Sequence, residues 1–206
     1  MSAVSTTPQI LLATNNPHKL EELRAIFTGL PVELVTPAAR GLALEVEETG
    51  STLEENAILK ARVYADAAGL PALADDSGLE INALDGAPGV HSRRFAGPNA
   101  TDAGRIRLVL ERLRDVPWEQ RTARFRCVIA LAEPGRLVGT VEGICEGLIT
   151  YEPRGQGGFG YDPIFWLPDR GCTMAELSAA EKNRISHRAR AGEAARRLIA
   201  WWLGGE

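Results

Sequence analysis

Residues 9–27 read QILLATNNPHKLEELRAIF, and this stretch decides the class of fold. The short apolar run at residues 9–13 predicts a buried strand. A helix is predicted directly after it, because Asn16 can cap its N-terminus, Pro17 suits the first helical position, and apolar residues then recur at helical spacing. A strand that leads through a polar turn into a helix is typical of an α/β domain.

The polar turn at residues 14–19, TNNPHK, has the sequence of an anion site. A helix N-terminus presents N–H groups without helical partners and a partial positive charge. Lys19 in the first turn is unfavourable to the helix dipole, and an anion bound beside it would explain its presence. The turn is not a Walker loop, because it lacks the glycines and the GK[ST] ending. A capped helix with a solvated lysine is the alternative.

The rest of the chain continues this alternation of strands and helices, with a hairpin turn predicted at Pro134-Gly135 and a capping box predicted from Ser51 and Glu54. Because the chain contains neither a linker nor an internal repeat, we expect residues 1–206 to form a single domain with two lobes. Strands are predicted at residues 32–36, 79–84, 122–133 and 136–150, helices at residues 52–68, 101–114 and 187–203, and glycine-rich loops at residues 85–100 and 152–160.

Composition excludes several classes of protein. The net charge of -4 gives no basic field, so binding to nucleic acid is not expected. The three cysteines are scattered without a CxxC pair, which indicates reduced thiols. The N-terminus lacks the features of a signal peptide, and no stretch approaches the roughly 20 apolar residues of a membrane span. A cytoplasmic protein without a membrane partner is predicted.

Lysine is rare in this chain. Of the 23 residues that are lysine or arginine, only three are lysine: Lys19, Lys60 and Lys182. Each lies in a helical or loop-to-helix segment with a polar signature. An ammonium on a flexible stem is a good point-charge partner for phosphate oxygens. We therefore favour a polyphosphate site over a chance bias of composition.

Two acidic pairs could act beside such phosphates. The stretch ADDSGL, residues 74–79, is predicted to end a strand in a glycine turn, where open α/β sheets place ligand chemistry. Either Asp75 or Asp76 could bind Mg²⁺ or orient a water, while the other bonds into the turn. Glu47 and Glu48 add oxygen ligands of the kind that Mg²⁺ uses. A solvated acidic loop is the alternative.

A second constellation of polar and aromatic residues lies in the C-terminal half. In GGFGYDP, residues 157–163, glycines permit close approach of a ligand, Phe159 could stack on a base, and Asp162 could accept hydrogen bonds. His187 and Arg188 at the start of the last predicted helix could donate to a base that carries a carbonyl. The alternatives are a hairpin turn followed by core aromatics, and a lone histidine that lies at the surface or is satisfied by protein contacts.

Taken in this order, these segments resemble the inosine and xanthosine triphosphate pyrophosphatase family, which hydrolyses deaminated purine nucleoside triphosphates. The likeness spans the chain, and the combination of ADDSGL, GFGYDP and the late SHR is its most specific part. The family often has TGN at the first loop, where this chain has TNN. The matching segments are LLATNNPHKLEEL, EETGSTLEENAILKA, ALADDSGLEINALDGAPGVHSRRFAG, GGFGYDPIF and EKNRISHRA.

The resemblance implies an elongated α/β fold, in which a long curved mixed β-sheet is flanked by helices, with two lobes, a central substrate cleft and usually a homodimer. It implies hydrolysis of ITP, dITP and XTP to the nucleoside monophosphate and pyrophosphate with Mg²⁺, which cleanses the nucleotide pool.

Carried over residue by residue, the resemblance makes Asp76 the proton acceptor and a Mg²⁺ ligand, with Glu47 or Glu48 also reaching the metal. The implied substrate residues are Thr14, Asn15, Asn16, Pro17, His18, Lys19 and Lys60 at the triphosphate, Ser77, and then Phe159, Gly160, Tyr161, Asp162, Lys182, His187 and Arg188 around the nucleotide, the last of these reading the base.

Two other functions remain open. The chain could act on modified pyrimidine triphosphates, as in the related septum-formation inhibitor family, or it could sense nucleotides without hydrolysing them. The acidic pairs argue against a pure binding module, because carboxylates around a polyphosphate are unfavourable unless a metal is present.

Overall fold

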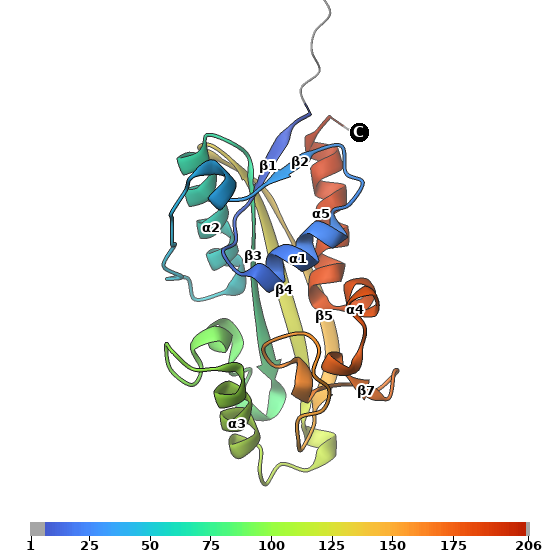
Figure 1. Ribbon diagram of the computed structural model, residues 1–206. Helices are drawn as coiled ribbons and strands as arrows, with labels where there is room; N and C mark the ends of the chain where they lie inside the picture. Colours follow the sequence, from blue (N-terminus) through green and yellow to red (C-terminus); the bar gives the residue numbers. More distant parts are fainter. Residues whose placement is uncertain (1–6, 205–206) are drawn as a thin grey trace, which may run out of the picture. The chain divides into compact units, whose positions relative to one another are not determined.

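The computed structural model describes residues 7–204. The predicted absence of a signal peptide rests mainly on residues 1–6, which lie outside the described residues. The strands form one seven-stranded sheet in the order β2-β1-β3-β4-β5-β6-β7 (Figure 1). Strand β1 pairs in parallel with β2 and β3, whereas β6 pairs antiparallel with β5 and β7. The predicted α/β fold with a mixed sheet is therefore confirmed.

The elements follow the predicted alternation along the chain. The strands are β1 (Gln9–Leu12), β2 (Glu33–Val35), β3 (Ala72–Ile81), β4 (Thr122–Glu133), β5 (Arg136–Ile149), β6 (Phe165–Leu167) and β7 (Cys172–Thr173). The α-helices are α1 (Pro17–Ile26), α2 (Leu53–Ala68), α3 (Asp102–Arg112), α4 (Ala179–Ile185) and α5 (His187–Trp202).

The chain divides into two compact units. Unit 1 comprises residues 1–76, 128–141 and 192–206, and unit 2 comprises residues 77–127 and 142–191. One boundary falls inside strand β3, between Asp76 and Ser77. Consecutive residues of one strand thus belong to different units.

Local capping explains where the helices of unit 1 begin. The side chain of Asn16 accepts hydrogen bonds from the N–H groups of His18 and Lys19, as the predicted cap of α1 requires. Helix α2 begins one residue later than predicted, because the capping box is formed by Thr52 and Glu55 rather than by Ser51 and Glu54. Both pairs have the spacing of a capping box, so the motif alone did not distinguish them.

Strand β3 corrects the predicted glycine turn. It runs without interruption through residues 75–78, so the two aspartates lie within a strand instead of at its end. A Cβ atom on Gly78 would lie 2.4 Å from the carbonyl oxygen of Gly89. This glycine therefore permits a close approach of two backbone segments in unit 2. Within the strand, Asp75 and Asp76 are buried, with 2% and 5% of their surface exposed.

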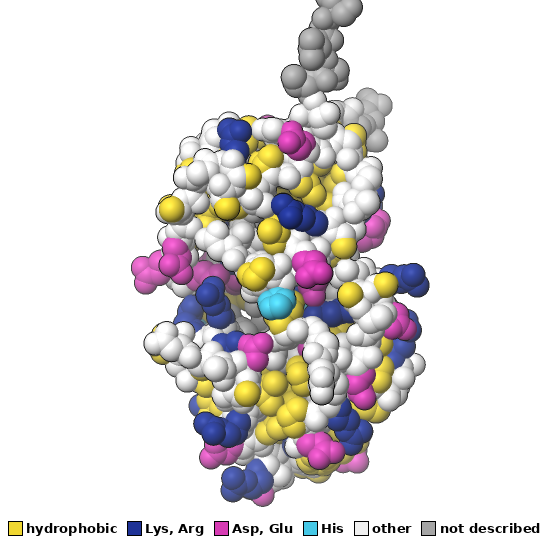
Figure 2. All heavy atoms as spheres, viewed as in Figure 1, with side chains coloured by type: hydrophobic (Ala, Val, Ile, Leu, Met, Phe, Trp, Pro, Cys, Tyr) yellow, Lys and Arg dark blue, Asp and Glu magenta, His cyan; other side chains and the backbone are white. Residues whose placement is uncertain are grey.

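The distribution of charge on the surface agrees with the small net charge of the chain. Charged side chains of both signs are interspersed on the face that Figure 2 presents. Within residues 7–204, no helix combines the length and the apolar character that crossing a membrane requires.

The core of unit 2 contains a buried arginine. Arg121 is 1% exposed, and its guanidinium donates to the carbonyl oxygens of Leu113 at 2.7 Å, Val116 at 3.3 Å, Ile149 at 2.7 Å and Thr150 at 2.8 Å. It thereby ties the end of helix α3 to the end of strand β5. Burial lowers the pKa of Arg121, yet an arginine remains charged near neutral pH.

Replacing Arg121 with methionine is expected to lower the free energy of unfolding by roughly 3 kcal/mol, because buried carbonyl groups lose their donor. Urea unfolding of the variant measures this change. Arg124→Met is the control, since Arg124 is 46% exposed and pairs with Glu80 at the surface, where such pairs contribute less than about 1 kcal/mol. Equal losses in the two variants would contradict this role of Arg121.

Candidate functional site

Each of the two consecutive aspartates of β3 pairs with a lysine in unit 1. The Lys19 ammonium, in the first turn of α1, lies 2.9 Å from a carboxylate oxygen of Asp75. The Lys60 ammonium, on helix α2, lies 2.9 Å from a carboxylate oxygen of Asp76. The structure therefore brings Lys19, in the turn after the first strand, into contact with the acidic pair of β3.

A second carboxylate shares the ammonium of Lys60. Its Nζ lies 2.7 Å from Oε1 of Glu48, which precedes helix α2 in the sequence. Along residues 41–50 exposed and half-buried side chains alternate, so Glu48 is half-buried while its neighbour Glu47 is exposed. The two glutamates therefore differ in exposure, while the metal ligand, for which the sequence left both open, stays a prediction. Glu48 joins Lys60 and Asp76 in what we call the unit 1 cluster, together with Lys19 and Asp75.

Asn56 belongs to the same cluster and was missed by the sequence analysis. Its amide donates to Oδ2 of Asp76 at 3.3 Å, and its Oδ1 accepts from the N–H of Gly50 at 2.7 Å. A signal for it existed in the sequence, because Asn56 and Lys60 share the helix face of Leu53, and all three side chains are buried. A polar residue on the apolar face of a helix is a candidate for a buried site.

Charge and burial compete in the unit 1 cluster. Burial raises the pKa of Asp76, and the nearby Lys60 and Lys19 offset this only in part. Burial opposes ionisation of Glu48 as well, but Lys60 lowers the pKa of Glu48 below its ordinary value. Burial would lower the pKa of Lys60, whereas the charges of Asp76, Asp75 and Glu48 together raise it. Lys60 is therefore an ammonium near neutral pH.

Side chains of the turn at residues 14–19 form hydrogen bonds within the turn and to neighbouring segments. The Asn15 side chain donates to the carbonyl of Leu44 at 3.0 Å and to the hydroxyl of Tyr64 at 3.2 Å. The N–H of Asn16 donates to Oγ1 of Thr14 at 3.2 Å. His18 and Pro17 are exposed.

The cap of α1 bears on the predicted anion site at this turn. The N–H groups of His18 and Lys19 donate to Oδ1 of Asn16 at 3.0 and 3.3 Å, so both groups already have an acceptor within the protein. An anion at the start of α1 would therefore meet the Lys19 charge and the helix dipole rather than these two donors.

Unit 2 contains a second cluster, formed around Asp162. This carboxylate is buried, and its Oδ2 lies 2.5 Å from Nζ of Lys182 and accepts from the N–H of Phe159 at 2.9 Å. A Cβ atom on Gly158 would lie 2.1 Å from the same oxygen. The glycine before Phe159 is thus required for the carboxylate to reach the loop.

The Phe159 ring lies among cations. Nζ of Lys182 is 4.6 Å from the ring centroid, and the guanidinium carbon of Arg188 is 5.6 Å from it. Arg188 also donates to Oγ of Ser77 at 2.9 Å. We call Asp162, Lys182, Phe159, Arg188 and Ser77 the unit 2 cluster.

Other contacts in unit 2 hold the predicted base-reading residues. His187, 5% exposed, stacks on Phe125 with ring centroids 4.7 Å apart. It is therefore not at the surface, and this stacking agrees with the alternative of a histidine satisfied by protein contacts. The hydroxyl of Tyr161 donates to the carbonyl of Ser92 at 2.8 Å, and burial raises the pKa of Tyr161. Phe125 and Ser92 carried no signal in the sequence, because their roles depend on contacts between distant segments.

The unit 1 cluster has few protein ligands for a metal. Among the described residues, no group of three or more His, Cys, Asp or Glu side chains is arranged to hold an ion. Glu48 and Asp76 nevertheless present carboxylate oxygens to one common ammonium. Mg²⁺ is usually bound by one or two carboxylates, with water and substrate phosphates completing its shell. These two side chains fit that requirement.

Comparison with known proteins gives consistent results. The model of the Ham1 family matches residues 10–198. The dITP/XTP pyrophosphatase of Geobacillus kaustophilus is 52% identical over 183 residues, which cover 89% of this chain and 90% of that protein. The structure of a HAM1 protein from Coxiella burnetii is 48% identical, with a TM-score of 0.86, and the match covers 94% of this chain and 99% of that one. The Ham1 protein of Staphylococcus aureus is 38% identical, with a TM-score of 0.84 over 94% of this chain and 99% of that one.

Proposed function

Because the chain belongs to the Ham1 family, we propose that it hydrolyses dITP, XTP and ITP to the nucleoside monophosphate and pyrophosphate. This activity removes non-standard purine nucleotides before they enter DNA or RNA. The observation that carries the proposal is the unit 1 cluster, where Lys19 pairs with Asp75 and Lys60 pairs with Glu48 and Asp76, the two carboxylates suited to a metal. We further expect a homodimer in the cytoplasm, as the family resemblance implies.

The charge of the unit 1 cluster supports a requirement for a divalent cation. Its two ammonium groups, on Lys19 and Lys60, face three carboxylates, on Glu48, Asp75 and Asp76. A cluster with this excess of negative charge repels a triphosphate. Mg²⁺ held by Glu48 and Asp76 would reverse the sign of the site and neutralise charge on the phosphates. Both side chains are hard oxygen donors, which favours Mg²⁺ over zinc.

The side chains of the cluster have separate tasks in this reaction. Asp76 accepts the proton of the water that attacks the α-phosphorus in line with the pyrophosphate that leaves. Lys60 and Asn56 bond its two carboxylate oxygens and so fix its orientation. Lys19, at the start of α1, supplies positive charge to the phosphates together with the helix dipole.

The unit 2 cluster supports recognition of the base. Phe159 offers an aromatic face for stacking, and Lys182 and Arg188 beside it are donors only. Hypoxanthine and xanthine present a carbonyl at position 6, which accepts hydrogen bonds from such donors. Adenine presents an amino group there, so donor would face donor.

The substitution Asp76→Asn is expected to abolish pyrophosphate release from dITP in the presence of Mg²⁺, because the amide cannot accept the proton of the water. The protein is expected to stay folded, because the amide has the shape of the carboxylate and its oxygen can still accept from Lys60, which also keeps its pair with Glu48. An assay of pyrophosphate release measures the activity of the variant, and circular dichroism measures whether it is folded. A folded variant with nearly wild-type rates would remove Asp76 from its catalytic role, and a wild-type protein that binds dITP without cleaving it would favour the nucleotide-sensing module.

Glu47 and Glu48 form a matched pair for testing the metal site. Glu48→Gln is expected to raise the Mg²⁺ concentration needed for half-maximal activity about tenfold or more, because the ion loses one of its two carboxylates. Glu47→Gln should leave the Mg²⁺ dependence unchanged, since Glu47 is exposed. Titration of the activity with Mg²⁺ after chelation distinguishes the two. The opposite order of effects would place the ligand at Glu47.

Selectivity for the base is expected to favour dITP and XTP over dATP by roughly 10- to 100-fold in kcat/KM, because one buried donor left unpaired costs about 1–3 kcal/mol. Parallel assays with dITP, XTP, dATP, dTTP and UTP measure it. Equal rates with dATP and dITP would contradict the proposed reading of the base. Preference for dTTP or UTP would instead favour the pyrimidine alternative.

A further inference from the structure

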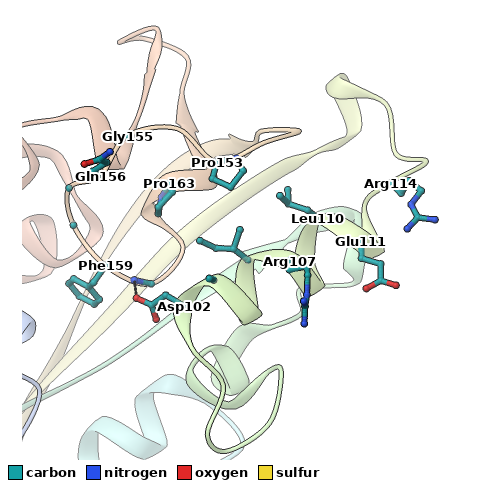
Figure 3. Close-up of a pocket in the computed structure, with 15 residues that line it drawn as sticks. Asp102, Arg107, Leu110, Glu111, Arg114, Pro153, Gly155, Gln156, Phe159 and Pro163 are labelled. Carbon is teal, nitrogen blue, oxygen red and sulfur yellow. Dashed lines mark hydrogen bonds between the residues drawn. The ribbon is translucent and has the colours of Figure 1, made fainter.

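The loop that carries Phe159 is held by a side chain of helix α3. The N–H of Gly160 donates to Oδ2 of Asp102 at 2.7 Å, and Figure 3 shows this carboxylate directed at the loop backbone. Asp102 is the first residue of α3 and lies 58 residues before Gly160 in the sequence. Neither the motifs of the chain nor the resemblance pointed to this residue.

Asp102 is itself fixed in position. Its other carboxylate oxygen pairs with the guanidinium of Arg105, one turn further along α3. Arg105 in turn donates to the carbonyl oxygens of Arg93 at 3.0 Å and Ala100 at 2.6 Å. A carboxylate in the first turn of a helix is also favoured by the helix dipole. The oxygen that meets Gly160 therefore has a defined location within unit 2.

The loop has space behind it. A cavity of about 920 Å³ separates it from much of helix α3, with Ile106, Leu110 and Pro163 among its apolar lining residues. In Figure 3 the Phe159 ring points away from Leu110. Because little side-chain packing supports the loop on the cavity side, hydrogen bonds carry more of its positioning.

We propose that Asp102 is a positioning residue for base recognition, which holds the Phe159–Gly160 backbone so that the Phe159 ring stays beside Lys182 and Arg188. The inference rests on the proposed function, since it names a determinant of how that function reads the base. Asp102 acts through the loop and does not touch the substrate. Its loss allows the loop to move toward the cavity, and the aromatic face is then displaced from the base.

The test compares Asp102→Ala with Thr101→Ala. Thr101 caps helix α3 by accepting from the N–H of Gly104 at 3.1 Å, so its loss weakens the same helix start without removing the bond to Gly160. For Asp102→Ala, we expect KM for dITP to rise about tenfold with kcat within about twofold, because ground-state and transition-state binding weaken together. For Thr101→Ala, we expect a lower melting temperature with an unchanged KM.

Two further measurements separate positioning from simple stability. Hydrogen exchange of the Gly160 amide, followed by NMR in the protein without substrate, should accelerate about tenfold or more in Asp102→Ala and stay at the wild-type rate in Thr101→Ala. Asp102→Asn keeps an oxygen acceptor and should recover most of the wild-type KM. If the alanine variant does not fold, Asp102→Ser serves in its place, because the shorter side chain cannot reach Gly160.

The outcomes are distinct. A wild-type KM in folded Asp102→Ala or Asp102→Ser, or an equal rise of KM in Thr101→Ala, would overturn the inference. Absence of pyrophosphate release from dITP by the wild-type protein would overturn the proposed function instead. In that case exchange of the Gly160 amide and binding of inosine monophosphate still test the role of Asp102, and unchanged values of both in Asp102→Ala overturn it.

Discussion

Three buried aspartates, each paired with a lysine, are the constraint on which both clusters depend. The chain has only three lysines, and they meet Asp75, Asp76 and Asp162 at 2.9, 2.9 and 2.5 Å. An ionised carboxylate taken out of water costs several kcal/mol unless a partner compensates it. Helices α1, α2 and α4 must therefore bring their lysines to these positions for the chain to fold with its aspartates charged. The positions of the three lysines are thus explained by their aspartate partners.

Such pairs do not by themselves make the protein more stable than apolar residues would. Replacing a buried ion pair by well-packed apolar side chains is often neutral or favourable. Their presence at Asp76 and Asp162 is better explained by the positions in which they hold the two carboxylates. The pair at Asp76 holds a carboxylate next to Glu48, and the pair at Asp162 holds a carboxylate that bonds the loop at Phe159. Each pair thus fixes the position of one buried carboxylate, one in each unit.

The sequence predicted those parts of the fold and the site that local patterns determine. The strand, turn and capped helix at residues 9–27, the hairpin at Pro134-Gly135 and the start of α5 follow from hydrophobic spacing and capping residues. The glycine turn at Gly78 was wrong because the requirement for glycine comes from Gly89, a contact that no local pattern encodes. Phe125 and Asp102 could not be predicted for the same reason. Asn56 was missed too, although a polar residue on an apolar helix face is a signal that the sequence contains.

The two clusters differ in whether local sequence patterns or contacts between distant segments determine them. The unit 1 cluster is built largely from short segments whose own patterns place Lys19, Lys60 and Asp76 on regular elements. The loop around Phe159 instead depends on distant anchors, at Asp102 and Ser92. Regular elements hold side chains more exactly than loops do, and phosphate chemistry tolerates little displacement. Under the proposed function, a change in the anchors of the loop would therefore alter selectivity for the base while Lys19, Lys60 and Asp76 keep their positions.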